Sequence, residues 1–358
     1  MDVRYEVINR VAVITLDRPR ALNALSHGMV QQMDGMLTEA AADAGIRALL
    51  IRGAGPKAFC AGGDVVALAQ SAAEDTALHR DFFVDEYRLD FRIHAFPKPV
   101  VVFMHGVVMG GGMGLAQGAS LRLVTDNVRI AMPETRIGLV PDVGATHFFS
   151  KMPAPLALYL ALTGTTIGAS DALFVGLADA RAKVDDADGV TSLLAEIDWA
   201  LSGSTDLALL RCALSKQPDG AHLDDAVLPS QSEAIFRHFD PLLDLATVVK
   251  QLEESPTDWA QANAATLRKH SPLMLALCRE ALNIGRGLAL PDCFKLEYGL
   301  VQYAMQCGEF NEGVRAHLID KDRAPKWLYS AIEDVGAPVI EQALRRAQTL
   351  SLDFALTD

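Results

Sequence analysis

The sequence predicts an α/β fold, with strands and helices that alternate along the first half of the chain. Short apolar runs that end at glycine or proline are typical of buried strands, and the segments between them carry apolar residues at helical spacing. Near residue 185 this alternation stops and helical spacing dominates. We therefore expect an α/β core over residues 1–185 and a mainly helical C-terminal region over residues 186–358 that packs on the core.

The first elements of the core can be placed one by one. The run YEVINRVAVITL predicts two short strands that join near Asn9, and Pro19 ends this unit. Residues 24–44 predict a helix with Ser26 as its N-cap, because a serine just before an apolar-periodic segment accepts from free N–H groups. Residues 46–55 predict a short buried strand that ends in glycine.

The same pattern continues through the rest of the core. Residues 57–70 predict a loop that runs into a helix, residues 76–96 a long helix, and KPVVVFMHG an apolar strand. Three consecutive glycines then open a helix within residues 108–119, and residues 120–134 hold two more short strands. In the long helix we expect the run DEYRLD to form a solvated edge, apart from Glu86.

The composition indicates which kinds of molecule the protein can bind. The chain has 358 residues, a formal net charge of −13 and a pI near 5.1. Nucleic-acid binding rests on clustered Lys and Arg, so we expect no nucleic-acid partner. A small anionic ligand stays possible, because a helix N-terminus can bind phosphate within an acidic protein.

The cysteines and the apolar runs indicate the cellular environment of the protein. The five cysteines show no CxxC spacing and no disulfide density, so neither a metal site nor a secreted scaffold is indicated, and we expect a reducing, cytoplasmic setting. The N-terminus has charges throughout, and no apolar run is long enough to span a bilayer. We therefore expect neither export nor membrane insertion.

Two glycine-rich loops are the first candidates for chemistry. FCAGGDV and HGVVMGGGMG each place glycines before a helix N-terminus, where backbone N–H groups are exposed without Cβ obstruction. Two such loops can each supply one N–H to a single oxygen, which is the geometry of an oxyanion hole. The alternative is that the glycines only permit tight turns or close packing.

Glu134 and Asp142 are the second candidates. They lie eight positions apart in MPETRIGLVPDVGATHF, in a loop held by proline and glycine, among apolar neighbours that would desolvate them. Desolvation and mutual repulsion raise a carboxyl pKa, which suits acid/base or nucleophilic work near neutral pH. The structural alternative is that both are caps, with Asp142 as the N-cap of the segment VGATHFFSKM.

These motifs, in this order and spacing, resemble the crotonase (enoyl-CoA hydratase/isomerase) superfamily. The resemblance covers about the first 185 residues and rests on KAFCAGGD, HGVVMGGGMGLA and MPETRIGLVPDVGATHF. It implies a crotonase-like spiral ββα core, an acyl-CoA ligand, and a thioester oxygen held by the N–H groups of Gly63 and Gly111. It also places Gly62, Asp64 and Gly110 of the two loops against the substrate.

The carboxylates narrow the choice within this superfamily. Its hydratases use two glutamates, one at the position of Glu134 and one where this chain has Gly114, so simple hydration is disfavoured. A carboxylate pair at the spacing of Glu134 and Asp142 is similar to two subfamilies, 3-hydroxyisobutyryl-CoA hydrolases and dienoyl-CoA isomerases. EFNEGVRAHLIDKDRAPKW resembles the tail of the hydrolases, and FFVDEY matches their pattern with a glutamate at Glu86.

The resemblance to these hydrolases implies roles for the acids. Glu134 would act as base or as nucleophile, Asp142 would handle the proton or orient water, and Glu86 would bind a substrate hydroxyl. The expected reaction is hydrolysis of a short branched 3-hydroxyacyl-CoA, 3-hydroxyisobutyryl-CoA of valine breakdown. Two alternatives stay open: an isomerase or atypical hydratase on the same scaffold, and a non-catalytic acyl-CoA-binding protein.

Cofactors and contacts complete the expectations. We expect no metal and no redox cofactor, with coenzyme A as part of the substrate, and a homo-oligomer is possible because the superfamily often forms trimers or hexamers. The segment EGVRAHLIDKD is dense in opposite charges. We expect it to dock the C-terminal helices on the core, or on a partner subunit, through ion pairs.

Overall fold

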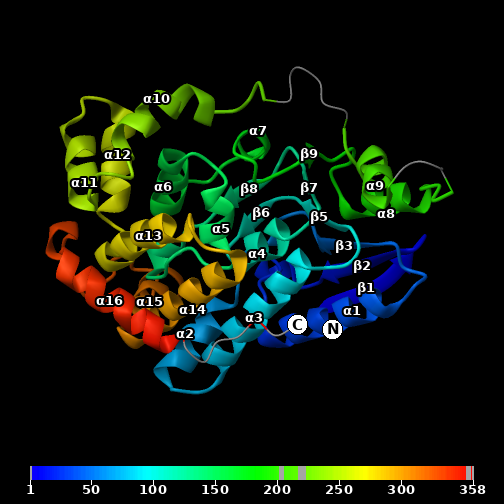
Figure 1. The fold of residues 1–358 in the computed structure, drawn as a ribbon, viewed down its shortest axis with the longest axis horizontal. Helices are drawn as coiled ribbons and strands as arrows, with labels where there is room; N and C mark the ends of the chain where they lie inside the picture. The colour runs from blue at the N-terminus through cyan, green and yellow to red at the C-terminus, as the bar shows by residue number, and fades with distance from the viewer. Residues whose placement is uncertain (1, 201–204, 217–222, 352–355, 357–358) are drawn as a thin grey trace.

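The computed structural model describes residues 2–200, 205–216, 223–351 and 356 (Figure 1). Its larger sheet has six strands in the order β1 (Val3–Ile8), β2 (Val11–Leu16), β3 (Ala48–Gly53), β5 (Val100–Met104), β7 (Leu121–Val124) and β9 (Ala180–Arg181). β1 and β2 are antiparallel, and the other neighbours are parallel. The predicted turn near Asn9 is confirmed, with Asn9 and Arg10 both at positive φ.

A second sheet of three parallel strands contains β4 (Ala58–Cys60), β6 (Val107–Met109) and β8 (Arg129–Ala131). Each of these strands follows a strand of the larger sheet directly in the chain, and a helical turn comes after each. This repeated strand, strand, helix unit is the spiral that the resemblance implied. One expectation was wrong in detail: residues 58–60 form a strand, because they pair with β6, instead of a loop.

Seven helices accompany the sheets before residue 185. They are α1 (His27–Ala42), α2 (Val65–Ala73), α3 (Leu78–His94), α4 (Gly111–Gln117), α5 (Ala145–Ser150), α6 (Ala154–Thr163) and α7 (Ala169–Phe174). Ser26 caps α1 as predicted, since its hydroxyl accepts from the N–H of Met29 at 3.3 Å. The helix predicted to open on the glycine run is α4, which begins at Gly111.

The C-terminal region is helical in the residues that the structure describes, and no strand follows β9 there. Parts of the predicted range, residues 201–204, 217–222, 352–355 and 357–358, lie outside the described residues. The helices are α8 (Ala187–Ala195), α9 (Asp206–Leu214), α10 (Leu228–His238), α11 (Leu245–Glu254), α12 (Asp258–Leu267), α13 (Pro272–Gly285), α14 (Leu290–Gln306), α15 (Glu309–Val314) and α16 (Ala337–Leu350). The boundary at residue 185 stays a prediction.

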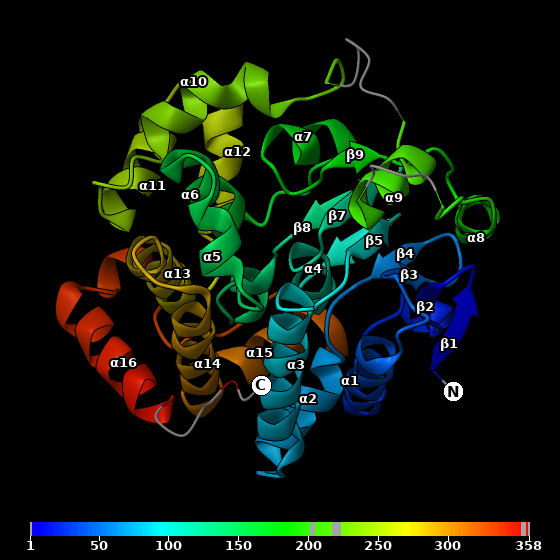
Figure 2. The same ribbon diagram turned by 45° about the vertical axis from the view of Figure 1, so that its right-hand side comes forward.

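These helices cover the core on two sides (Figure 2). α8 and α9 pack on one face of the large sheet, where Leu194 and Leu210 join Val13, Leu50 and Val101 in one apolar cluster. On the other side α13 packs against α5 and α6, and α14 packs against α3 and α5. The expected packing of the C-terminal region on the core is therefore present.

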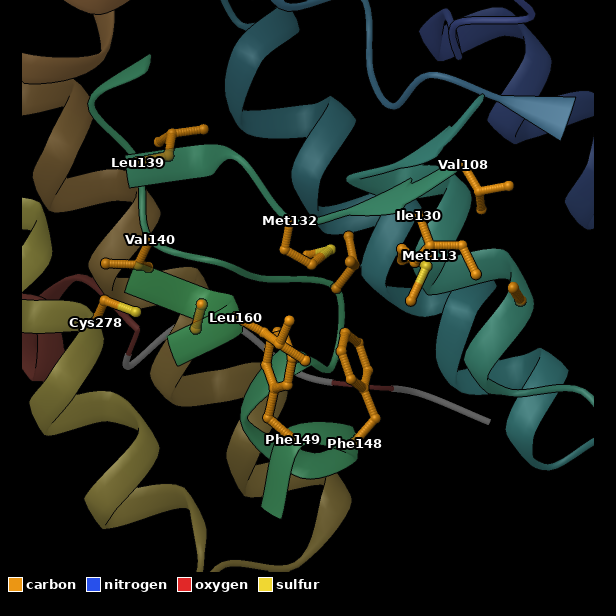
Figure 3. Close-up of a cluster of buried hydrophobic side chains, with 14 of the residues drawn as sticks. Val108, Met113, Ile130, Met132, Leu139, Val140, Phe148, Phe149, Leu160 and Cys278 are labelled. Atoms are coloured by element: carbon orange, nitrogen blue, oxygen red, sulfur yellow. The ribbon is translucent and has the colours of Figure 1, made fainter. Parts of the chain in front are cut away.

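The stretch between β8 and α5, which holds both candidate acids, rests on apolar side chains (Figure 3). Met132, Leu139 and Val140 are buried and lie with Phe148 and Phe149 in one cluster. The two candidate acids on this stretch therefore have apolar surroundings, as the sequence predicted.

Candidate active site

The two glycine loops and the acids meet in one cavity of about 280 Å³. Seven of the eight residues predicted from the sequence line it: Gly62, Gly63, Glu86, Gly110, Gly111, Glu134 and Asp142. The eighth, Asp64, is not among the lining residues. Its carboxylate lies 3.4 Å from a guanidinium nitrogen of Arg18.

The N–H group of Gly63 is directed toward the cavity by the pairing of its neighbours. Leu25 donates its N–H to the carbonyl of Gly62 at 2.8 Å and accepts from the N–H of Asp64 at 2.9 Å. In extended backbone the residue between two such bonds presents its own N–H on the opposite side. Within the described chain the N–H of Gly63 has no protein acceptor.

The N–H group of Gly111 is free because it belongs to the first residue of a helix. The carbonyl of Gly110 accepts from Met113 at 2.7 Å and from Gly114 at 3.2 Å, whereas the N–H of Gly111 precedes the first intrahelical bond. The two loops touch, since an ideal Cβ on Gly62 would lie 3.7 Å from the nitrogen of Gly111. Among the described residues, the N–H groups of Gly63 and Gly111 are therefore both without a protein acceptor and lie in two loops that touch.

Glycine is needed in these loops for steric reasons. Gly62 has φ of 101° and Gly110 has φ of 49°, a region that L side chains rarely adopt. A Cβ on Gly111 would overlap Oε1 of Glu86, so this carboxyl group lies directly against the loop. The glycines thus serve the close approach of the two loops and of Glu86, as the packing alternative expected, while the oxyanion-hole interpretation stays a prediction.

Glu134 begins the 3-10 turn η2 (Glu134–Ile137) and is buried with its carboxyl group in the cavity. Oε1 is 3.3 Å from the position of an ideal Cβ on Gly110, and Oε2 is buried without a hydrogen-bond partner. Burial raises the pKa of Glu134 well above its usual value, and the charge of Asp142 raises it further. A free, desolvated carboxyl group beside the donor pair is placed for direct attack or for activation of water.

Asp142 is buried and accepts a hydrogen bond of 2.6 Å from the hydroxyl of Tyr87 on α3. Burial raises its pKa to about 6, and the bond from Tyr87 opposes this rise. Its carboxylate does not cap α5, since the N–H groups of Gly144 and Thr146 donate to Glu297 instead. The capping role is therefore not what the structure shows for this side chain.

A third acid, Glu86, shares α3 with an acid that sequence reasoning missed. Glu86 and Asp90 are one helical turn apart and both are buried, and neither Oε1 of Glu86 nor either oxygen of Asp90 has a partner. Burial is the main cause that raises the pKa of both groups. The charge of Asp90 raises the pKa of Glu86 further, and the charge of Asp142 raises the pKa of Asp90 further. The expectation of a solvated edge was wrong for Tyr87, Leu89 and Asp90, which are all buried. Spacing of three and four residues puts Leu89 and Asp90 with Glu86 on the inward face.

Asp90 also explains why residue 114 is glycine in this chain. A Cβ at that position would overlap Oδ2 of Asp90 and would come within 2.7 Å of the Cβ of Val143. The site therefore has no room for a side chain at Gly114. A glutamate from α4, which the superfamily's hydratases use, is absent and could not be accommodated without rearrangement.

The C-terminal region reaches the cavity through the segment that was expected to dock on the core or on a partner subunit. The π-helix η3 (Arg315–Ile319) places His317 and Leu318 among the lining residues. Docking of this segment on the core is confirmed, but in the described residues Arg315 forms no ion pair with the core: it pairs with Glu312, Asp320 and Asp322 of its own segment. The contact is instead a close backbone approach, in which a Cβ on Gly313 would overlap the carbonyl of Ile137.

Two absences hold for the part of the chain that the structure describes. No group of three or more His, Cys, Asp or Glu side chains could hold a metal ion. No helix in the described residues is both long and apolar enough to cross a membrane.

Fold and site together define a crotonase-like spiral core with two glycine loops and buried acids in one cavity. Comparison with known proteins agrees: the family model described as enoyl-CoA hydratase/isomerase matches residues 11–344, so the chain belongs to that family. A solved enoyl-CoA hydratase from Rhodobacter sphaeroides is similar with a TM-score of 0.84 and 37% identity, over 96% of this chain and 97% of that one. A carnitinyl-CoA dehydratase from Mycobacterium thermoresistibile gives 0.86 and 33%, over 100% and 97%.

Several proteins that are similar to this chain in sequence are named as hydrolases. The mitochondrial 3-hydroxyisobutyryl-CoA hydrolase of Danio rerio is 36% identical over 344 residues, which are 95% of this chain and 88% of that protein. A probable 3-hydroxyisobutyryl-CoA hydrolase of Arabidopsis thaliana is 32% identical, over 97% and 92%. Several such relatives are called mitochondrial, so the cytoplasmic setting expected from the cysteines has no support in these names.

Proposed function

We propose that this protein hydrolyses 3-hydroxyisobutyryl-CoA to 3-hydroxyisobutyrate and free CoA. The observation that carries the proposal is the meeting of Glu134, Asp142 and two unused N–H donors in one cavity. The relatives named for this substrate extend over nearly the whole chain, including the C-terminal segment that supplies part of the cavity wall.

The donors act on the thioester carbonyl. Its oxygen would accept from the N–H groups of Gly63 and Gly111, and these bonds strengthen as negative charge develops on that oxygen. The cavity is small and largely apolar at Phe82 and Phe83, so little water competes for the donors. This arrangement polarises the carbonyl carbon for attack from the side of Glu134.

The charge of Asp142 affects the ionisation of Glu134. The Tyr87 hydroxyl stabilises the charged form of Asp142, and this charge raises the pKa of Glu134 and so favours the proton on it. Before Glu134 can attack or activate water it must lose that proton, and the Asp142 carboxylate is the base within the cavity. This gives Asp142 the proton-handling role and Glu134 the direct one.

Two routes use these groups equally well. In one, Glu134 attacks the carbonyl, the C–S bond breaks, CoA leaves as the protonated thiol, and water then cleaves the mixed anhydride. In the other, Glu134 takes a proton from water, which attacks the carbonyl directly. Label in the Glu134 carboxyl group after a single turnover in heavy-oxygen water would establish the anhydride route with water attack at the Glu134 carbon, whereas trapping with hydroxylamine detects an anhydride whichever carbon water attacks.

Glu86 is proposed to bind the substrate hydroxyl. The raised pKa of Glu86 favours its protonated form, which can donate one hydrogen bond and accept another. Its unpartnered Oε1 lies against Gly111, one of the two proposed oxyanion donors. A hydroxyl a few bonds from the thioester carbonyl is in reach of this group.

The test is thiol release from 3-hydroxyisobutyryl-CoA, 3-hydroxypropionyl-CoA and crotonyl-CoA, with wild type beside Glu134→Gln and Asp142→Asn. We expect rapid release from the hydroxyacyl thioesters, and losses of about 10²–10⁴ in kcat for both variants. Loss or gain of enoyl absorbance without thiol release would move the protein to the isomerase or hydratase class. Tight binding without any turnover would make it an acyl-CoA-binding protein.

We also propose that the reaction needs no metal and no redox cofactor. Nucleophile, base and carbonyl donors all come from Glu134, Asp142 and the two glycine loops. Full activity after exhaustive dialysis against a chelator is the expected result. A homo-oligomer stays a prediction, to be measured by light scattering on the purified chain.

A further inference from the structure

The backbone directly after Asp142 has a conformation that its own residues do not favour. Val143 has φ of 55° and Gly144 has φ of 85°, so two consecutive residues are in the left-handed region. A β-branched residue rarely adopts positive φ, and such a conformation persists only where the surrounding structure holds it. Something outside this stretch must therefore fix it.

Glu297 on α14 stabilises this backbone conformation through hydrogen bonds. Its carboxylate accepts from the N–H of Gly144 at 2.7 Å, from the N–H of Thr146 at 2.7 Å and from the hydroxyl of Thr146 at 2.6 Å. The side chain is completely buried. Burial raises its pKa to about 8, and the bonds from Thr146 and Gly144 oppose this rise.

Without Glu297 the same donor would attract Asp142. An aspartate commonly accepts from the N–H two residues further on, in an Asx-turn, and for Asp142 that residue is Gly144. In this structure the N–H of Gly144 is already used, and the Asp142 carboxylate faces the cavity with Tyr87 as its donor. The two arrangements exclude each other, since one N–H cannot serve both carboxylates well.

We propose that Glu297 is a positioning residue for Asp142: by occupying the N–H groups of Gly144 and Thr146 it prevents the Asx-turn and leaves the Asp142 carboxylate in the cavity. The inference rests on the proposed function only for its activity readout, and the pKa of Asp142 is a readout that does not depend on it.

The first test replaces Glu297 by Gln and measures kcat, KM and the pH profile of kcat/KM. The groups that face Asp142 in the wild type are Tyr87, Glu86 and Asp90 on α3, Glu134 on η2, and Glu297 itself. We expect kcat to fall at least about tenfold with KM within about twofold. The acid limb should move to lower pH, because N–H donors in an Asx-turn stabilise the charged form of Asp142.

A matched control separates positioning from simple loss of stability. Asp171 on α7 is also a buried carboxylate at a helix N-terminus, and it accepts from the N–H groups of Val227 and Leu228, both at 2.8 Å. Asp171→Asn should lower the unfolding midpoint and leave kcat and the acid limb unchanged. If Glu297→Gln behaves in the same way, Glu297 is merely structural and the proposal is wrong.

Two further measurements keep the inference testable on its own. Thr146→Val removes one of the three bonds at almost constant volume, so it should shift the limb less and in the same direction, even if the Glu297 variant does not fold. If the wild type releases no thiol from any CoA thioester, the proposed function has failed. The Asp142 pKa, followed by carbon NMR in wild type and Thr146→Val, then decides, because this variant keeps the Glu297 carboxyl group: a fall supports positioning, and an unchanged value overturns it.

Discussion

Replacement of Tyr87 by Phe tests the proton-handling role of Asp142. The change removes one buried hydroxyl and the 2.6 Å bond that it donates to Asp142, at almost unchanged volume. Such a bond to a charged acceptor is worth about 1.5–3 kcal/mol. Since about 1.4 kcal/mol corresponds to one pKa unit, the pKa of Asp142 should rise from about 6 to roughly 7–8.

The pH profile of thiol release is the assay. If Asp142 must be ionised, kcat/KM at pH 7 should fall by roughly twofold to tenfold, because the ionised fraction drops from about 0.9 to roughly 0.1–0.5, while the rate near pH 9 should stay close to that of wild type. Tyr159→Phe, in an apolar cluster on α6, is the control and should leave the profile unchanged. An equal loss at every pH, with the limb unmoved, would refute the assignment of this limb to Asp142.

Two other predictions concern stability. Gly114→Ala should lower the free energy of unfolding by about 1–3 kcal/mol in urea titration, since its Cβ would overlap Asp90 and crowd Val143. Gly35→Ala is the control: it has open space around it and should raise the free energy of unfolding by about 0.4–1 kcal/mol. Equal effects of the two substitutions would contradict the steric argument. The Asp90→Asn variant should gain stability relative to wild type as pH rises from about 4 to 8. The reason is that a group whose folded pKa is raised loses its stabilising contribution as pH rises through that pKa. A difference in unfolding free energy between variant and wild type that stays constant with pH would show that Asp90 does not titrate.

Local sequence was sufficient for the parts of the site that lie close together along the chain. The glycine loops and the pair Glu134 and Asp142 each sit within a few residues of a strand end or helix start, so spacing alone places them. For α3 the periodicity could have placed Asp90 as well. It shares a face with Glu86 and with the buried Ile93, and only its charge suggested an exposed position.

Glu297 and His317 could not be predicted in the same way. Helical spacing from Phe294 and Leu300 places Glu297 on the buried face of α14, but its partner Gly144 is more than 150 residues away in the chain. His317 enters the cavity because Gly313 allows α15 and η3 to approach η2 closely, which is a property of the packed chain. The partners of both residues follow from tertiary contacts that leave no signal in the local sequence.

We therefore expect residues of both the α/β core and the C-terminal region to set the pKa of Asp142. Tyr87, from the α/β core, donates to the Asp142 carboxylate and lowers its pKa, whereas Glu297, from the C-terminal region, occupies the donors that would lower it further. Removal of the first should move the acid limb up, and removal of the second should move it down. Opposite shifts from two variants that contact Asp142 from different helices would show that one carboxylate is being tuned, because a general loosening of the site would move both limbs the same way.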